Sequence, residues 1–329
     1  MAKTETVLQQ RSPAFIRSIG VEQEGFAPGI SCADVEPVPG GFFIDDAGHH
    51  LWELVTHVQT SVSAAIAVLK EMSARYPDID FTPFRPASLQ GAADQWHEKA
   101  RYRCILEALR RESSEWHVVH QMTNQAALQV NVGGDFDPFG DEGAFLINVF
   151  NDLAPFVAAM IHHELGSGKG HLQIWQRFAR AERLPAAGRW FLSGSDMVRY
   201  IESTPKLIKE TAPNSNVYVP LPGEMQRIDC RLDLGLIWWF ARAKVSEHGS
   251  YLEIRLMPSM PLVAAEQYAN LMVRMVEFLL EWFHGSNRGQ PVSDRHQAWD
   301  AYLELGQRCS GYIPNRPLTA EVWRELLLR

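Results

Sequence analysis

The sequence predicts an α+β fold in which helices back an antiparallel β-sheet. Short segments with alternating polar and apolar residues, typical of strands, are interleaved with longer segments of helical periodicity. The spacing of the strands is irregular, and no GxGxxG sequence follows a predicted strand, which disfavours a doubly wound dinucleotide-binding fold. An antiparallel sheet with helices packed on it accounts for both observations.

The N-terminal part of the chain predicts two strands and two helices. Residues 15–26 alternate in polarity and predict a strand, and the short apolar run at 42–44 predicts another. Residues 52–75 carry leucine, valine, isoleucine and methionine side chains at helical spacing, which predicts one long helix. Residues 95–115 predict a second amphipathic helix.

The rest of the chain predicts two further strands and four helices. Residues 126–133, which alternate over 128–132, and residues 251–257, which alternate throughout, predict strands. Between them, residues 140–165 place large apolar side chains at helical spacing. The same spacing predicts helices at 262–284, 294–308 and 319–328. We expect a single catalytic domain over residues 1–329, with the segment from about 262 to 329 packed on it.

Composition and charge narrow the function classes. The 329 residues are 46% hydrophobic and 21% charged, which is typical of a globular chain, and the net charge of −8 disfavours binding to nucleic acid or to a membrane surface. The first residues contain no apolar run, so we expect no signal peptide. The four cysteines are scattered and form no CxxC pair, which favours reduced thiols. We therefore expect a cytoplasmic protein, and a homodimer is the default expectation for a soluble enzyme.

Several predicted strands carry charged or amide residues on one face and apolar residues on the other. The residues on the polar faces are Glu22 and Glu24, then Gln129 and Asn131, then Glu253 and Arg255. Glu53 stands in the otherwise apolar stretch 51–55. Any one strand with such a face can simply be solvated on that side. Four such places in one chain favour a shared site.

The chemistry of these residues points to a divalent metal. An interior carboxylate is costly unless it is paired or metal-bound, and several converging carboxylates repel one another. Hard cations such as Mg²⁺ relieve that repulsion and take oxygen ligands. An arginine next to a ligand carboxylate suits a phosphate that the metal also holds. We therefore expect Glu22 and Glu24 to be metal ligands.

Five segments, in order, resemble motifs of the glutamate–cysteine ligase family, in particular its plant-type and carboxylate–amine ligase branches. Gly20-Val21-Glu22-Gln23-Glu24-Gly25-Phe26 resembles the family's opening G-[VIT]-E-x-E-x-F strand. The others are Leu51-Trp52-Glu53-Leu54-Val55-Thr56, the segment 122–132 with its Gln129-Val130-Asn131 sequence, Ile174-Trp175 with the arginines that follow it, and Tyr251-Leu252-Glu253-Ile254-Arg255. The resemblance covers roughly residues 15–260.

The resemblance implies a glutamine-synthetase-like fold, in which antiparallel strands form a funnel, and an ATP- and Mg²⁺-dependent ligase. In such an enzyme ATP phosphorylates a substrate carboxylate, and an amine attacks the acyl phosphate. Mn²⁺ is an alternative ion. The partners implied are an amino-acid-like carboxylate and a small amine.

The same resemblance implies roles for individual residues. The implied metal ligands are Glu22, Glu24, Glu53, Glu253 and Gln129, and Arg255 and Glu53 take catalytic roles at the transferred phosphoryl group. Gln129, Asn131, Arg242 and Arg255 are expected to contact the nucleotide. His171, Trp175 and Arg183 are expected to contact the substrate.

The chain departs from the family pattern in two places. Another glutamate is usual just before the second segment, where this chain has His49 and His50, preceded by Asp45 and Asp46. His49 is the predicted replacement ligand, the other three stay open as alternatives, and so does the loss of one metal site. In the substrate segment, His171 stands where an arginine is usual. Two other functions therefore remain open: a small-molecule phosphotransferase that uses the same site, and a non-catalytic relative that binds a ligand.

Overall fold

The computed structural model describes residues 15–27, 32, 35–36, 38–85, 99–112, 123–165, 183, 189–212, 215, 217–221 and 226–309. At its centre is a six-stranded sheet with the strand order β2-β3-β1-β4-β8-β7. Every neighbouring pair of strands in this sheet is antiparallel. The strands are β1 (Ile16–Phe26), β2 (Gly41–Asp45), β3 (Leu51–Thr56), β4 (Ala127–Gly134), β7 (Ala241–Ser246) and β8 (Gly249–Pro258).

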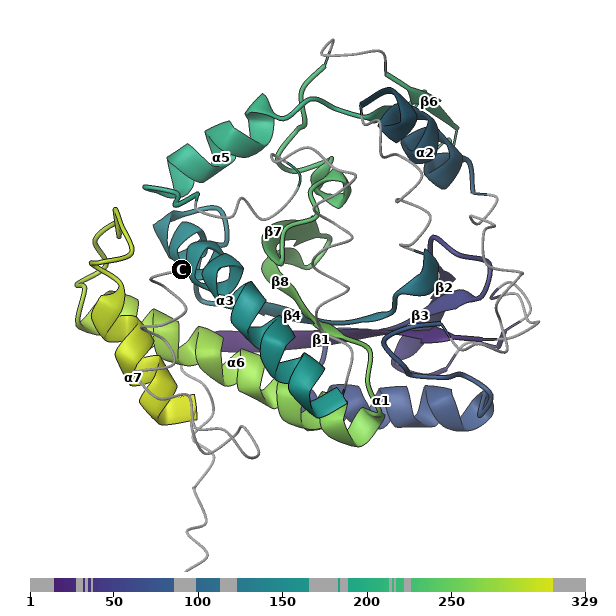
Figure 1. The fold of residues 1–329 in the computed structure, drawn as a ribbon, viewed down its shortest axis with the longest axis horizontal. Coiled ribbons are helices and arrows are strands. Elements are labelled where there is room, and N and C mark those ends of the chain that lie inside the picture. Colours follow the sequence, from purple (N-terminus) through teal and green to yellow (C-terminus); the bar gives the residue numbers. More distant parts are fainter. Residues whose placement is uncertain are drawn as a thin grey trace, which may run out of the picture.

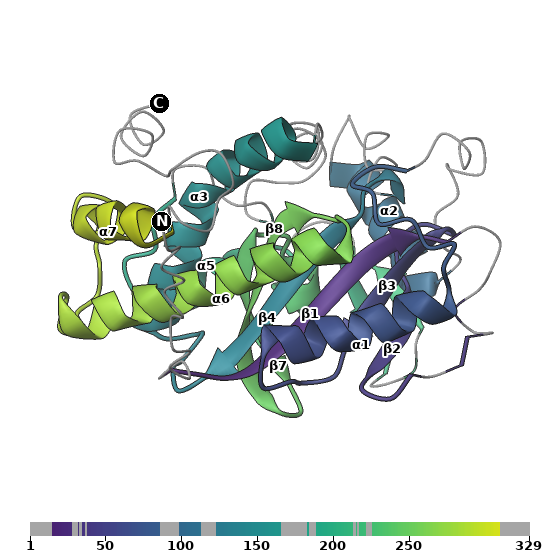
Figure 2. The ribbon, with the colours of Figure 1, turned by 90° about the horizontal axis from the view of Figure 1, so that it is seen from below.

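Helices cover one face of this sheet. In Figures 1 and 2, α1 (Val62–Arg75) and α6 (Leu262–Gly285) lie along the sheet on the same side. The long helix α3 (Asp141–Leu165) packs against β7 and β8, and α7 (Trp299–Cys309) packs against α6. The apolar residues of the strands face this layer. Val21, Val130 and Ile254 are fully buried there, as the alternation of a half-polar sheet requires.

A smaller set of elements lies over the other face of the sheet (Figure 1). It consists of α2 (Ala100–Glu112), α5 (Gly194–Ser203), the short strands β5 (Ile208–Glu210) and β6 (Tyr218–Pro220), and the 3₁₀ turn η4 (Leu234–Leu236). The β5 and β6 strands pair with each other and pack against α2. Among the described residues, no helix combines the length and the apolar character needed to cross a bilayer.

The register of the sheet brings polar residues from different strands next to one another. Glu24 pairs with Glu53 across β1 and β3, and Glu22 pairs with Gln129 across β1 and β4. Asn131 pairs with Glu253 across β4 and β8. Directly opposed residues of an antiparallel pair point to the same face, so these side chains share one side of the sheet.

The strands predicted at 15–26, 42–44, 126–133 and 251–257 are confirmed, and the antiparallel α+β arrangement with them. The single helix predicted at 52–75 is wrong. Residues Leu51–Thr56 form the strand β3, and the helix begins only at Val62. Ser61 fixes that start, because its hydroxyl caps the helix by accepting a hydrogen bond from the Ala64 N–H. The funnel and the glutamine-synthetase-like fold stay predictions.

The other helix predictions hold with shifted ends. Helices at 140–165 and 262–284 are confirmed as α3 and α6. The helix predicted at 95–115 is α2, with residues 95–98 and 113–115 outside the described residues. The helix predicted at 294–308 begins later, at Trp299, and the one at 319–328 lies outside the described residues. The elements α5, β5, β6 and β7 were not predicted.

Candidate active site

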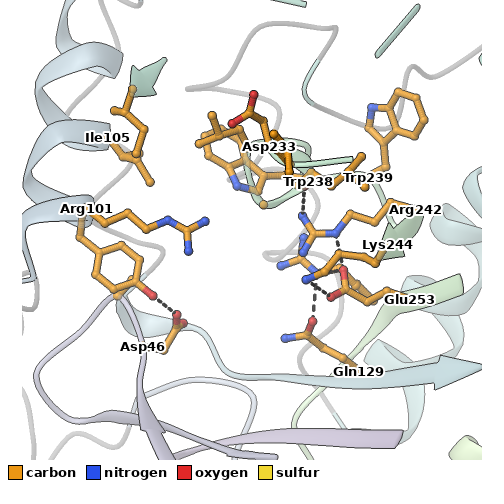
Figure 3. A pocket seen from close by; sticks show the side chains of 18 of the residues that line it. Asp46, Arg101, Ile105, Gln129, Asp233, Trp238, Trp239, Arg242, Lys244 and Glu253 are labelled. Carbon is orange, nitrogen blue, oxygen red and sulfur yellow. Dashed lines mark hydrogen bonds and ion pairs between the residues drawn. The ribbon is translucent and has the colours of Figure 1, made fainter. Parts of the chain in front are cut away.

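A cavity of about 970 Å³ lies over the polar face of the sheet. Its floor consists of residues from β1, β3, β4, β7 and β8. Its opposite wall consists of residues from α2, from β5 and from the segment 231–240. Figure 3 shows side chains from both walls pointing into this space. The cavity therefore contains the polar residues that the sequence pattern singled out, together with a wall that the pattern did not predict.

Four carboxylates gather on the β1–β3 side of the floor: Glu22, Glu24, Glu53 and Asp46, called here the acidic cluster. Glu24 accepts hydrogen bonds from the Ala127 N–H at 2.8 Å and from Gln129 Nε2 at 3.1 Å. Gln129 Nε2 also lies 3.1 Å from Glu53 Oε1.

The other two members of the acidic cluster have donors of their own. Asn131 donates to Glu22, and Tyr102 donates to Asp46 at 2.7 Å. All four carboxylates are thus oriented by uncharged donors, namely amide groups and a tyrosine hydroxyl. These donors leave the negative charge of the acidic cluster uncompensated.

The charge of the acidic cluster changes the acidity of its members. Burial raises the pKa of Glu24 well above its ordinary value, and the negative charge of Asp46 raises it further. Burial also raises the pKa of Glu53, and Glu22 and Asp46 add to that shift. Both shifts mean that the site holds more negative charge than it can stabilise alone. A cation placed among these oxygens would relieve the repulsion.

Three cationic side chains gather on the β7–β8 side of the floor: Arg242, Lys244 and Arg255, called here the cation cluster. They surround Glu253, which is only 1% exposed. Arg242 donates to one carboxylate oxygen of Glu253, and Lys244 donates to the other at 3.1 Å. Burial opposes the ionisation of Glu253, but Arg242, Lys244 and Arg255 outweigh it and hold its pKa below the ordinary value.

Arg242 and Arg255 differ in how much freedom they have. Arg242 is 5% exposed, and besides Glu253 it donates to the carbonyl oxygens of Leu234 and Ile237. Arg255 is more open: its Nε donates to Gln129 Oε1 at 3.2 Å and lies 3.6 Å from Glu253. Three cations around one carboxylate leave a net positive charge, which suits an anionic ligand such as a phosphate.

The donor set of the acidic cluster fits a hard divalent cation. All of its ligand atoms are oxygens, which Mg²⁺ prefers. Asn131, predicted to contact the nucleotide, is not among the residues that line the cavity; its Nδ2 contacts Glu22, and its buried Oδ1 has no hydrogen-bond partner among the described residues. Within the described ranges, however, no three His, Cys, Asp or Glu side chains already form a metal cage. Mg²⁺ is commonly held by one or two carboxylates together with substrate phosphates, and an open cluster suits that mode.

The structure separates the predicted metal ligands. Glu22, Glu24, Glu53 and Gln129 come together on the cavity floor, whereas the predicted ligand Glu253 lies among the cations. His49 is not among the residues that line the cavity, and Asp46 is. Among Asp45, Asp46, His49 and His50, Asp46 is therefore the residue that joins the acidic cluster.

The predicted substrate residues lie elsewhere. Arg183 is fully buried and donates to the Pro205 carbonyl oxygen at 2.5 Å, and its own carbonyl accepts from the Trp238 N–H. Arg183 is not among the residues that line the cavity, but its hydrogen-bond partner Trp238 is. His171 and Trp175 lie outside the described residues.

Sequence reasoning missed the wall opposite the sheet. Arg101 reaches into the cavity from α2 (Figure 3), and Tyr102 of the same helix also lines it. Lys206, another lining residue, forms an ion pair with Asp233 at 2.6 Å. The guanidinium of Arg101 fills the space next to Gly235, where an added Cβ would come within 2.4 Å of it. No local pattern predicts this wall, because it depends on α2 and η4 folding over a sheet that is far away in the chain.

No protein-family model and no curated protein matches the chain. Among solved structures, it is similar to a glutamate–cysteine ligase from Francisella tularensis in complex with AMP. The TM-score is 0.42, and 11% of residues are identical over 95% of this chain and 82% of that one. It is also similar to a bifunctional glutathione synthetase from Pasteurella multocida, with a TM-score of 0.36 and 12% identity. The second match covers 95% of this chain and 46% of that one.

Proposed function

We propose that the chain is an ATP- and Mg²⁺-dependent ligase that joins a small carboxylate to an amine through an acyl phosphate. The observation that carries the proposal is the pairing of an acidic cluster with a cation cluster on one sheet face, linked by Gln129. A metal–polyphosphate complex has the complementary pattern, since its cation needs carboxylates and its phosphates need arginine and lysine. The ordered motifs that resemble the glutamate–cysteine ligase family support the same reading.

The proposal assigns each cluster one task. Glu22, Glu24, Glu53 and Asp46 hold the metal, whose chemistry when bound is to neutralise charge on the phosphates. Arg255 and Lys244 contact the transferring phosphoryl group, because they are the more exposed members of the cation cluster. Glu253 positions these cations through its buried ion pairs, and Arg242 is already engaged by Glu253 and by two carbonyl oxygens.

The reaction requires these residues to act mainly by electrostatics and position. Phosphoryl transfer spreads negative charge over the equatorial oxygens, and fixed cations in a partly buried site stabilise that charge strongly. The substrate carboxylate oxygen attacks the γ-phosphorus and ADP leaves. The amine then attacks the acyl carbon, forms the C–N bond and releases inorganic phosphate. In this scheme the cavity holds both partners next to each other, which reduces the entropic cost of the reaction.

The experiment that tests this function measures ADP release with panels of small carboxylates and amines in the presence of Mg²⁺. A ligase releases ADP and phosphate in equal amounts only when both partners are present. Hydroxylamine should replace the amine and trap the acyl phosphate as a hydroxamate. Glu24→Gln should abolish product formation, because it removes one charge from the acidic cluster. Full activity of that variant would remove Glu24 from the mechanism.

The same assay separates the two other functions. A stable phosphorylated product that forms without any amine identifies a phosphotransferase. Failure to bind nucleotide with Mg²⁺ would support the third function, a non-catalytic relative that binds another ligand. Glu247→Gln is a suitable control, because Glu247 is 87% exposed and does not line the cavity.

A further inference from the structure

Gln125 is a buried glutamine whose carboxamide is unsatisfied. Gln125 is among the residues that line the cavity and is 4% exposed. Neither its Oε1 nor its Nε2 has a hydrogen-bond partner in the described part of the chain. A buried polar group without a partner costs about 1–3 kcal/mol, and native proteins tolerate few of them. An unsatisfied carboxamide that borders a cavity is therefore suited to a ligand.

Gln125 lies apart from the phosphate-binding region described above. Gln125 lies two residues before β4, and Gln125, Ala127 and Gln129 all line the cavity; the Ala127 N–H donates to Glu24. Gln125 thus lies at one end of the acidic cluster. The cation cluster lies toward the opposite end of β4, where Asn131 pairs with Glu253. A polyphosphate that spans both clusters leaves Gln125 free for another part of the bound molecules.

We infer that Gln125 binds, through both atoms of its carboxamide, a planar ligand group that offers one hydrogen-bond donor beside one acceptor. A carboxylate does not fit, because it only accepts and would leave Oε1 without a partner. Two sources have the required chemistry. One is the edge of the adenine base, which glutamine pairs with bidentately. The other is a primary amide or peptide group of the second substrate.

A second buried glutamine in the same sheet provides a matched control. Gln23 is fully buried; its Oε1 has no hydrogen-bond partner in the described part of the chain, but its Nε2 donates to Ser259 Oγ at 2.9 Å and to the Met260 carbonyl oxygen at 2.7 Å. Gln23 is not among the residues that line the cavity. Methionine has nearly the same shape as glutamine but makes neither hydrogen bond. Gln23→Met therefore breaks existing bonds, whereas Gln125→Met breaks none.

The first measurement compares thermal unfolding of the ligand-free full chain. Gln125→Met should unfold at the wild-type temperature or above it, and Gln23→Met should unfold at a lower temperature. Equal destabilisation of both variants would overturn the inference, because it would mean that Gln125 supports the fold. This comparison does not depend on the proposed ligase function.

The second measurement tests binding by calorimetry, with a non-hydrolysable ATP analogue plus Mg²⁺, and with a panel of free amino acids and their primary amides. Gln125→Met should weaken one of these classes by about 10- to 100-fold, the size expected for two hydrogen bonds. A loss with the ATP analogue identifies the base edge, and a loss with the amides identifies the second substrate. Unchanged binding of every ligand that the wild type binds would overturn the inference. Failure of the wild type to bind the ATP analogue would count against the proposed function instead.

Discussion

The carboxamide oxygen of Gln129 accepts a hydrogen bond from Nε of Arg255 at 3.2 Å. The nitrogen of the same carboxamide donates to both Glu24 and Glu53. A single neutral side chain therefore orients the two charged halves of the site relative to each other. An amide can do this because it carries a donor and an acceptor at once, which neither a carboxylate nor a cation does.

Replacing Gln129 by methionine should separate the two halves. The variant loses three hydrogen bonds, so the carboxylates and Arg255 are no longer held in place. We expect kcat/KM for ATP to fall by about 10- to 100-fold and the free energy of unfolding to fall by roughly 1–3 kcal/mol. Steady-state kinetics and chemical denaturation measure the two effects. Wild-type kinetics in a stable variant would contradict the linking role.

Replacing Glu53 by glutamine should stabilise the metal-free protein while it removes activity. Burial, Glu22 and Asp46 raise the pKa of Glu53, so folding favours its protonated form. The folded wild type gains stability by keeping this proton. That stability is lost as the pH rises from the ordinary glutamate pKa of 4.5 toward the raised pKa of Glu53. At neutral pH we expect Glu53→Gln to be more stable by roughly 1 kcal/mol.

Thermal unfolding in a chelator, measured as a function of pH, checks this expectation. The gap between Glu53→Gln and wild type should close as the pH falls below the ordinary glutamate pKa. Added Mg²⁺ with an ATP analogue should reverse the order, because only the wild type keeps the full set of carboxylates. A variant less stable than wild type at neutral pH would contradict the proposed repulsion within the acidic cluster.

Replacing Glu253 by glutamine should have the opposite effect on stability. Arg242, Lys244 and Arg255 lower the pKa of Glu253, despite its burial, so its contribution is present at neutral pH. That contribution is lost as the pH falls below 4.5 toward the lowered pKa. Removing one partner of a buried ion pair costs about 3–5 kcal/mol. We expect Glu253→Gln to lose stability of that order at pH 7.

Denaturation curves at several pH values test the role of Glu253. The difference between Glu253→Gln and wild type should shrink as the solution is acidified. The exposed variant Glu247→Gln should behave as wild type throughout. A Glu253→Gln protein with wild-type stability at pH 7 would mean that the cation cluster does not need its carboxylate.

Replacing Arg255 by lysine should impair the chemical step more than nucleotide binding. Lysine keeps the charge, but it has no Nε–H in the position that contacts Gln129. Loss of one fixed donor at a developing charge typically lowers kcat by about 100- to 1000-fold. Single-turnover kinetics combined with calorimetry of an ATP analogue separate the two effects. A variant that loses affinity but keeps kcat would assign Arg255 to binding alone.

The polar faces of the strands were predictable because they follow the two-residue period of a strand. Glu22, Glu24, Gln129 and Arg255 came from that alternation, and the structure brings them to one cavity. The sequence placed Glu53 on a helix, since the apolar spacing of 62–75 continues smoothly upstream into 52–58. The residue that marks the true start of the helix is Ser61, which caps its N-terminus.

Other parts of the site depend on tertiary structure. Arg242 and Lys244 alternate with Ala241 and Ala243, yet their strand was not recognised because it is short and begins after two tryptophans. Gln125 could not have been singled out, since only the fold shows that its amide is buried without a partner. Likewise, Arg101 enters the site only because α2 faces the sheet across the cavity.

The most direct test of the central claim is calorimetric titration of a non-hydrolysable ATP analogue into the full chain, with Mg²⁺ and with a chelator. If the acidic cluster holds a metal and the cation cluster holds phosphates, one equivalent should bind with Mg²⁺, and binding should weaken strongly in the chelator. Glu53→Gln should bind weakly under both conditions. Absence of binding in the presence of Mg²⁺, or equal affinity with and without the metal, would contradict the account.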